Sequence, residues 1–363
     1  MIKRNWVAVR LLLIVIALAP LNAAELVTLS PENFEEYAPK GKEADAIYGD
    51  YVLRNEKIVV VVADPTLMVG RSGSRKSGDR LEGNIIDLAL RDAQNDLLIV
   101  YDPTLVWPRT RKTWPKGIAR EPHHQKGFVD EATAWKQPGR EPVKAPRVVL
   151  TLPMEAPGVV LRYTLEDGWR HVLVEMVHAA SKKHRKLVPY AALIMSTRNI
   201  DGREFIWGQS ADGKMSWMYD PWFGQAYGIV TTTYRMRQIH SRRRSRWLMH
   251  WFLPPGKEQV SAAPGEKVVV AQKIFPAANA FDARSTANAM AGVQEHPVRL
   301  TARDPRGPVA NAHVTAHQGK RFYAAGRTGK DGTLSIRLPE GKYAIRIAAP
   351  GRPEQTLMLD PAK

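Results

Sequence analysis

The sequence has 363 residues and no cysteine, and its 53 Lys and Arg residues against 36 Asp and Glu residues give a net charge of +17. A chain without cysteine is not a disulfide-stapled scaffold, but at this length core burial alone can support two or three domains. The positive charge favours polyanionic partners outside the cell, such as acidic polysaccharide, although general solubility on a basic surface is the more ordinary explanation.

Residues 1–24 have the features of a signal peptide. Lys3, Arg4 and Arg10 form a basic region, residues 11–19 are apolar, and small residues follow at positions 21–24. The apolar run is too short for a comfortable membrane span. We therefore expect an exported protein in the periplasm, at the cell surface or outside the cell, with no membrane span in the mature chain and no nucleic-acid partner. An uncleaved N-terminal anchor is the alternative.

Residues 25–276 read as one large β-sandwich domain. Short runs of β-branched and aromatic residues recur between Pro- and Gly-containing loops, and no heptad or fixed repeat is present. The expected strands are 58–63, 84–90, 96–101, 147–152, 159–165, 171–177, 188–195, 226–234 and 247–253. The fold class is thus mostly β: a large N-terminal sandwich, which could take a supersandwich-like form, and a small C-terminal sandwich.

The region 103–146 carries seven prolines and many charges, which predicts a long excursion over the sandwich surface. Residues 277–295 are rich in alanine and are expected to be a linker or short helix, with the main domain boundary there. The small C-terminal domain is expected to cover residues 296–361.

Sequence motifs for phosphate, metal and nucleophilic chemistry are weak or missing. Residues 70–77 superficially resemble a phosphate loop, but Arg75 stands where a second glycine is required, which favours a mobile basic loop. His123 and His124 are the only close histidine pair, and neighbouring residues of a strand or loop point apart. The sequence therefore predicts no catalytic residue, no metal site and no cofactor.

His171, Glu175 and His178 lie on one expected strand, in which His171 and Glu175 would share a face. A cleft role is conceivable for His171, but a packed histidine is the ordinary reading. Paired carboxylates of the glycosidase kind need not be near in sequence, and no signal selects a pair.

The stretch 205–229 is the richest in aromatic residues. Exposed aromatic faces can stack on sugar rings, whereas aromatic residues in strands are also ordinary core residues. Trp222 lies in the turn-like sequence Asp220-Pro221-Trp222-Phe223-Gly224 and is the one most expected to be exposed. Candidate ligand-binding aromatics are Trp217, Tyr219, Trp222 and Tyr227.

The next stretch, 233–251, loads an expected hairpin with arginine. Its candidate ligand-binding residues are Arg235, Arg237, Arg242, Arg243, Arg244 and Arg246. Arginine forks suit sulfate, phosphate and carboxylate. Together with Trp222, this hairpin would form a binding surface for an anionic polysaccharide; a solvated hairpin without ligand is the alternative.

Near the C-terminus, residues 333–338 and 343–347 alternate between apolar and polar residues around the turn Pro339-Glu340-Gly341. This pattern predicts a β-hairpin of a small sandwich, in which Ile345 points inward.

The segments "GPVANAHV" (307–314), "TGKDGTLSIRLPEGKYAIRI" (328–347) and "APGR" (349–352) resemble the carboxypeptidase regulatory-like domain. This resemblance covers about 65 residues. It implies a transthyretin-like sandwich that stabilises or positions a neighbouring domain and has no peptidase activity.

The segments 29–65, "GNIIDLALR" (83–91) and "YDPWFGQAYGI" (219–229) resemble the N-terminal region of large secreted bacterial proteins. In those proteins a regulatory-like sandwich and a PHP-type (CehA/McbA-like) metallohydrolase domain follow. This sequence ends at Lys363, where that metal-binding domain would begin, and its His-x-His ligands have no counterpart here. The resemblance therefore implies a non-catalytic region.

Sequence alone favours an exported, non-catalytic binding or accessory protein that recognises either a carbohydrate or a partner protein. The carbohydrate expected from the arginine-rich hairpin is an anionic polysaccharide. Two alternatives remain open. One is a carbohydrate-active enzyme whose carboxylates, or His171, carry no sequence signal, and the other is an accessory subunit of a separately encoded metallohydrolase.

Overall fold

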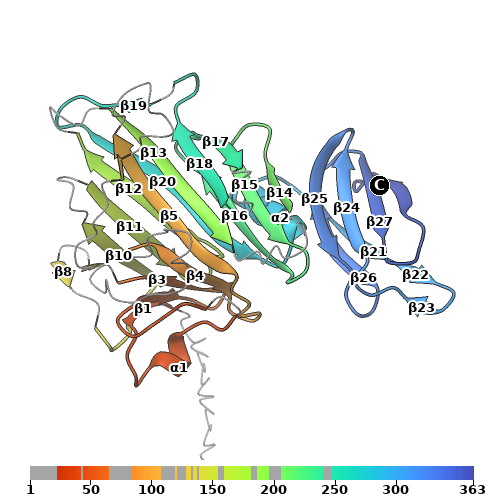
Figure 1. Cartoon of the computed structure of the whole chain (residues 1–363), viewed down its shortest axis with the longest axis horizontal. Coiled ribbons are helices and arrows are strands. Elements are labelled where there is room, and N and C mark those ends of the chain that lie inside the picture. Colours follow the sequence, from red (N-terminus) through yellow and green to blue (C-terminus); the bar gives the residue numbers. More distant parts are fainter. Residues whose placement is uncertain are drawn as a thin grey trace, which may run out of the picture.

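The computed structural model describes residues 23–41, 44–64, 83–107, 119–120, 128–131, 134–136, 139–153, 159–180, 186–195, 206–240, 247–257 and 259–363. Within these residues the protein is mostly β, with two large antiparallel sheets followed by smaller sheets at the C-terminal end (Figure 1). No helix in these ranges is long and apolar enough to cross a membrane.

The first large sheet has eleven strands within the described residues. Its order is β17 (Arg235–His240), β18 (Trp247–Leu253), β13 (Lys186–Met195), β5 (Leu98–Trp107), β4 (Ile85–Leu90), β3 (Ile58–Val62), β2 (Tyr51–Arg54), β1 (Ala24–Thr28) and β9 (Val143–Ala145). In addition, β19 (Val260–Ser261) pairs with β13, and β6 (Ala119–Arg120) pairs with β5.

The second large sheet has nine strands within the same ranges. Its order is β14 (Ile206–Gln209), β15 (Met215–Asp220), β16 (Gln225–Thr231), β20 (Lys267–Ala277), β12 (Val172–Ala179), β11 (Val159–Glu166), β10 (Arg147–Pro153), β7 (Phe128–Glu131) and β8 (Ala134–Lys136).

One hydrophobic cluster joins the two large sheets into a sandwich. Leu26 and Val60 of the eleven-stranded sheet belong to the same buried cluster as Leu161, Val174 and Ile274 of the nine-stranded sheet. The continuous apolar strand β3 is buried along its whole length because its second face is also covered. That cover includes Phe34 and Tyr37 of the short helix α1 (Phe34–Tyr37).

Polar side chains also connect the two sheets. The Tyr163 hydroxyl donates to the Gly83 carbonyl at 2.8 Å, and the Tyr227 hydroxyl donates to Asp96 Oδ1 at 3.0 Å. His250 Nε2 lies 2.9 Å from Ser216 Oγ, with both residues buried. Because each bond requires one particular pair of positions to meet, they fix how the two sheets face each other.

Two carboxyl groups of the eleven-stranded sheet region are fully buried: Asp87 lies in β4 and Asp96 lies just before β5. Asp87 Oδ1 accepts a hydrogen bond from the Asp45 amide at 2.8 Å, and Asp96 Oδ1 accepts one from the Leu88 amide at 2.9 Å. Burial raises the pKa of Asp87 well above its ordinary value, and the charges of Asp45 and Asp50 add to this. Burial, followed by the charge of Asp87, raises the pKa of Asp96 in the same way.

The C-terminal part forms a small sandwich. A four-stranded sheet has the order β25 (Arg321–Arg327), β24 (His313–Gln318), β27 (Tyr343–Ala348) and β28 (Gln355–Leu359). The paired strands β21 (His296–Thr301) and β26 (Thr333–Leu338) complete it, with the short pair β22 (Arg303–Asp304) and β23 (Gly307–Pro308) beside them.

Helix α2 (Ala280–Met290) lies between the two sandwiches. Asn279 caps it, since its side chain accepts a hydrogen bond from the Asp282 amide. Phe281 is buried in a cluster that contains Trp217 and Phe275 of the nine-stranded sheet and residues of β24, β25, β26 and β27. The residues expected to be a linker or short helix therefore form a helix, and its buried face belongs to a core shared by both sandwiches.

Two glycines make this shared core possible. A Cβ atom on Gly208 would lie 2.5 Å from the Trp217 ring, and one on Gly228 would lie 2.3 Å from the Phe275 ring. Any larger residue would therefore displace these rings from the nine-stranded sheet.

The mostly-β fold class is confirmed, and the expected strands agree with the observed ones to within a few residues, apart from β5. That strand continues to Trp107, and β7 and β9 also fall inside the region 103–146, which was expected to be a surface excursion. Strand β20, central in the nine-stranded sheet, was not expected. Strand β1 begins at Ala24, the last residue assigned to the signal peptide.

The burial of Ile345 gives a prediction for the stability of the small sandwich. Ile345 has 0% exposure, as the alternation predicts, whereas its neighbour Arg346 is exposed. We expect Ile345→Ala to lower the free energy of unfolding by about 2–5 kcal/mol, because it leaves a cavity in the core. Urea denaturation of the full chain, followed by circular dichroism, measures this. Arg346→Ala is the matched control, and an unchanged transition for Ile345→Ala would contradict the assigned strand faces.

The raised pKa of Asp87 gives a prediction for the pH dependence of stability. Because the folded state holds this proton more tightly than the unfolded state, stability should fall as pH rises from the ordinary carboxyl value of 3.8 towards the folded pKa. Asp87→Asn, which carries no charge, should flatten this fall. Melting temperatures between pH 4 and pH 8 test it, with Asp92→Asn at an exposed position as control. Parallel pH profiles for wild type and Asp87→Asn would refute the assignment.

Candidate functional site

The turn between β15 and β16 presents an exposed tryptophan. Asp220 Oδ1 accepts hydrogen bonds from the amides of Trp222 at 2.8 Å and Phe223 at 3.2 Å. Gly224 closes the turn with a φ of 67°, a conformation that glycine adopts without strain. This local structure leaves the Trp222 side chain at the surface with 57% exposure, as expected from the sequence.

Trp222 lines a groove between the large and small sandwiches, with a volume of about 540 Å³. Pro221 and Trp222 come from the large sandwich. The described residues that line it from the small sandwich are Ala310, Asn311, His313, Arg327, Ala348, Ala349 and Pro350. The groove is large enough for a part of an oligomeric ligand, since small-molecule sites typically measure about 300–1,000 Å³.

The small-sandwich side of the groove is built on three neighbouring strands. His313 of β24 is the register partner of both Arg327 of β25 and Ala348 of β27. Directly opposed residues point to the same face of a sheet, so these three side chains form one row. Val314, the next residue of β24, points the other way and is fully buried in the core.

Arg327 lies against Trp222 across the groove. Its guanidinium carbon is 4.7 Å from the centroid of the Trp222 ring, and Nη1 donates to the Asn311 carbonyl at 2.9 Å. Asn311 has a φ of 55°, a left-handed conformation that asparagine tolerates better than most residues. The turn before β24 thus supplies the carbonyl that orients the guanidinium.

His313 is a neutral group in this setting. Burial lowers its pKa, and the positive charge of Arg327 lowers it further. The Nε2 atom of His313 is buried and has no hydrogen-bond partner among the described residues. The groove therefore contains a fixed positive charge, a neutral imidazole and an aromatic ring.

This arrangement suits binding rather than acid–base catalysis. The described residues that line the groove include no carboxylate and no hydroxyl, and His313 is the one group among them that can accept a proton, so they offer no general acid–base pair. An aromatic ring beside a guanidinium can instead hold a ring-shaped ligand and orient its polar substituents.

The other three candidate aromatic residues are not available to a ligand. Trp217 and Tyr219 are 1% exposed and Tyr227 is fully buried. Trp217 and Tyr219 point from β15 into the core shared with α2, where Trp217 lies 5.8 Å from Phe322. Tyr227 points into the large sandwich and donates to Asp96. The prediction that these three rings stack on a ligand is therefore wrong. Strand alternation directs Trp217 and Tyr219 into the core shared with α2, and Tyr227 into the core between the two large sheets.

The arginine hairpin is described only in part. Arg235 and Arg237 are exposed on β17, whereas Arg242, Arg243, Arg244 and Arg246 lie outside the described residues. The Arg235 Cβ lies beside Gly213, in the turn before β15, and Trp222 follows the other end of that strand. Arg235 is therefore remote from the groove, and a common surface of Trp222 with the hairpin tip stays a prediction.

The histidines of β12 and the loop before it are packed. His171 stacks on Trp169 with ring centroids 4.4 Å apart, and burial together with the charge of Lys273 lowers its pKa to about 3. His178 is fully buried, and Glu175 is paired with Arg162 at 3.4 Å. His171 thus stays neutral and is hidden from a substrate.

Metal and phosphate sites find no support in the described ranges. These contain no group of three or more His, Asp or Glu residues that could hold a metal ion. The basic loop 70–77 and the pair His123–His124 lie outside them.

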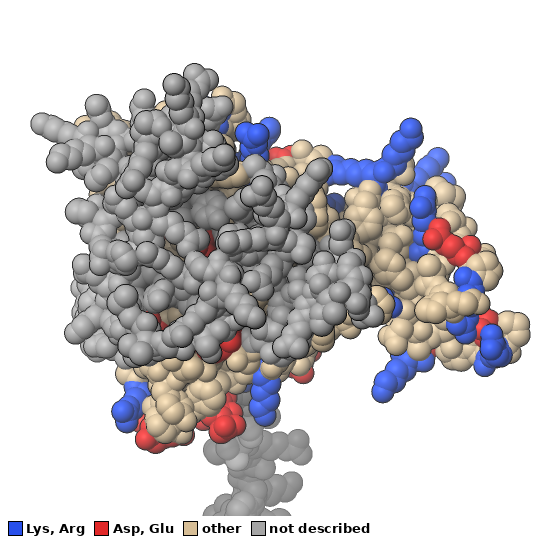
Figure 2. All heavy atoms as spheres, in the orientation of Figure 1, with Lys and Arg blue, Asp and Glu red and all other residues tan. Residues whose placement is uncertain are grey.

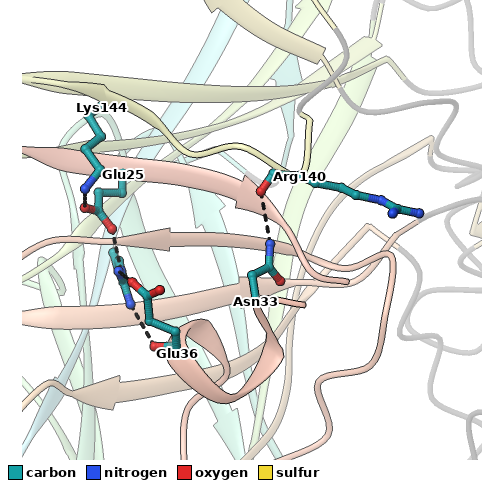
Figure 3. A network of polar contacts seen from close by, with 6 residues as sticks. Glu25, Asn33, Glu36, Arg140 and Lys144 are labelled. Atoms are coloured by element: carbon teal, nitrogen blue, oxygen red, sulfur yellow. Dashed lines mark hydrogen bonds and ion pairs between the residues drawn. The ribbon is translucent and has the colours of Figure 1, made fainter. Parts of the chain in front are cut away.

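A second cluster of charged side chains, far from the groove in the sequence, is made of ion pairs (Figure 3). Arg54 lies between Glu25 at 2.6 Å and Glu36 at 2.7 Å, and it covers the Tyr37 ring at 3.5 Å. Glu25 also pairs with Lys144 at 2.7 Å. Burial opposes ionisation of Glu25, but the hydrogen bonds from Lys144 and Arg54 outweigh it and lower its pKa. These charges neutralise one another and join α1 to β1, β2 and β9.

The sequence predicts a binding role for Trp222 on the large-sandwich wall of the groove, but for no residue of the small-sandwich wall. Trp222 is marked by its turn sequence. Asn311, His313 and Arg327 lie in segments that resemble a regulatory-like domain, for which the resemblance implies an accessory role. No sequence signal links them to Trp222, about 90 to 105 residues earlier in the chain.

Comparisons with known proteins give no family. No family model matches the chain, and no curated protein matches it. Among solved structures, the chain has limited likeness to a TPR-domain containing protein from Parabacteroides distasonis, with a TM-score of 0.36 and 14% identity over 62% of this chain and 46% of that one. A polysaccharide lyase has a TM-score of 0.31 and 10% identity, over 76% of this chain and 44% of that one.

A glycoside hydrolase family 81 enzyme from Clostridium thermocellum has a TM-score of 0.29 and 9% identity, over 91% of this chain and 35% of that one. The chain thus spans less than half the length of each of these three proteins. Likeness of this extent does not identify a shared activity or ligand.

Proposed function

We propose that the protein is an exported, non-catalytic carbohydrate-binding or accessory protein, and that the groove beside Trp222 is its ligand site. The observation that carries this proposal is the exposed Trp222 ring at the mouth of a groove with polar groups on its opposite wall. The apolar face of a sugar ring packs on an aromatic ring, while its hydroxyl groups require hydrogen-bond partners nearby.

Export is proposed from the signal-like sequence of residues 1–24, which lies almost wholly outside the described ranges. The small sandwich is proposed to be a carboxypeptidase regulatory-like domain on the resemblance of its segments. In this proposal it is more than a stabilising appendage, because it supplies one wall of the site.

The enzymatic alternative has less support. Asp87 and Asp96 are the described carboxyl groups with strongly raised pKa values, and both have 0% exposure. The pair His250 and Ser216 is equally buried. None of these groups lines the groove.

The proposal predicts that Trp222→Ala weakens glycan binding. A glycan array with the purified full chain first identifies the best oligosaccharide, and calorimetry then measures the affinity for it. We expect Trp222→Ala to reduce this affinity about tenfold or more, because aromatic side chains that become buried under a ligand contribute much of the binding free energy. The matched control is Phe223→Ala, which removes a ring with 44% exposure from the same turn but outside the groove.

Unchanged affinity for Trp222→Ala, in a protein with unchanged melting, would refute the site. A rise in reducing ends on incubation with the bound oligosaccharide would favour the enzymatic alternative instead.

A further inference from the structure

We infer that the groove selects a sugar residue that carries an oxyanion, either a uronate carboxylate or a sulfate ester, and that Arg327 is the residue that determines this specificity. This inference rests on the proposed function of the groove and adds the chemical class of its ligand. It depends on the charge balance around Arg327.

Arg327 is a partly buried cation whose hydrogen bond goes to a neutral group. Nη1 donates to the Asn311 carbonyl, and Nε is buried without a partner. Within the described part of the chain no carboxylate forms an ion pair with Arg327, and its guanidinium lies against the Trp222 ring. A partly buried guanidinium without a counter-charge is a favourable site for an anion, because little has to be displaced to pair it.

Several other arginines of this protein are paired with its own carboxylates. Arg54 has Glu25 and Glu36, and Arg170 contacts both oxygens of Asp282 at 3.1 and 2.9 Å. At the other end of the small sandwich, Arg352 lies 2.7 Å from Asp304. Arg284, like Arg327, lies on an aromatic ring and has a buried Nε without a partner among the described residues, but it does not line the groove. Arg327 differs from these in that its open side faces the groove.

The groups around Arg327 also favour a negative ligand. His313 faces it in the same row of side chains, and the positive charge of Arg327 disfavours protonation of this imidazole. A bound oxyanion would offset that charge and allow His313 to take up a proton. The ligand would then have two cationic partners, whereas a neutral sugar would leave His313 neutral and meet Arg327 alone.

The surface of the small sandwich supports the approach of a polyanion. Residues 296–363 contain twelve Lys and Arg against five Asp and Glu. In the view of Figure 2, Lys and Arg side chains stand out over much of this part of the molecule. Such an excess of one charge raises the association rate of an oppositely charged chain without deciding which residue of it is recognised.

The contact between Arg327 and Trp222 connects the two functions of the site. The Arg327 guanidinium lies over the Trp222 ring, with its carbon 4.7 Å from the ring centroid. A pyranose ring that packs on the part of the indole left uncovered presents a substituent at its edge to this guanidinium. A carboxylate or sulfate at that edge can accept two hydrogen bonds from the planar fork of arginine, which lysine cannot offer in the same geometry.

The experiment uses pairs of probes that differ only at the charged group. Oligogalacturonides are compared with their methyl esters, and a sulfated galactan oligosaccharide is compared with its desulfated form, all by calorimetry with the full chain. We expect at least one acidic probe to bind about tenfold or more tightly than its neutral partner. The pair that shows this preference distinguishes a uronate from a sulfate ligand.

Three variants assign the preference to Arg327. Arg327→Gln should abolish the preference while retaining the Trp222-dependent binding of the neutral probe, and Arg327→Lys should retain part of it. Arg346→Gln is the matched control, since Arg346 is exposed on β27 of the same sheet but does not line the groove. The nuclear magnetic resonance titration of His313 gives an independent readout, because the acidic probe should raise its pKa and the neutral probe should not.

The outcomes separate this inference from the proposed function. Equal affinity for acidic and neutral probes, together with unchanged binding by Arg327→Gln, overturns the anionic specificity while Trp222-dependent binding still stands. If Trp222→Ala has no effect and no probe binds in the groove, both are overturned. A preference that persists in Arg327→Gln but is lost in Arg346→Gln also overturns the assignment to this residue.

Discussion

The packing of α2 between the two sandwiches is the contact on which the candidate site depends. Phe281 on one face of the helix is buried with Trp217 and Phe275 of the nine-stranded sheet and with residues of the small sandwich. Arg170 of the large sandwich binds Asp282 at the start of the helix, and Arg284 covers the Tyr323 ring of β25 at 4.2 Å. A helix held on both sides in this way fixes the distance and angle between the two domains, because a close-packed core tolerates little displacement.

The groove is a consequence of that fixed geometry. Strand β25 runs beside β14 and β15, with Arg321 donating to the Gln209 carbonyl at 2.8 Å at one end and Arg327 resting on Trp222 at the other. At this second end the turn and the small sandwich leave the groove open beside the contact. A binding site between two domains is common, since neither domain alone has to fold around an open space.

The sequence by itself determined a good part of the fold. The run 58–62 indicates a buried strand, because it is short and all five of its residues are β-branched. The alternation around 333–347 is enough to assign Ile345 to the core. The turn from Asp220 to Gly224 exposes Trp222 for a local reason, since Asp220 bonds the amides that follow it. These features depend on near neighbours in the chain.

Tertiary structure alone decided which aromatic rings are buried and which charges are paired. Trp217, Tyr219 and Tyr227 have the same chemistry as Trp222, but both faces of their sheet are covered, one by the other large sheet and one by α2 with the small sandwich. Likewise nothing in the sequence distinguishes Arg327, which meets no carboxylate among the described residues, from Arg54, which meets two. Burial and ion pairing depend on residues distant in the chain, and their positions are set by the packing of whole sheets rather than by local pattern.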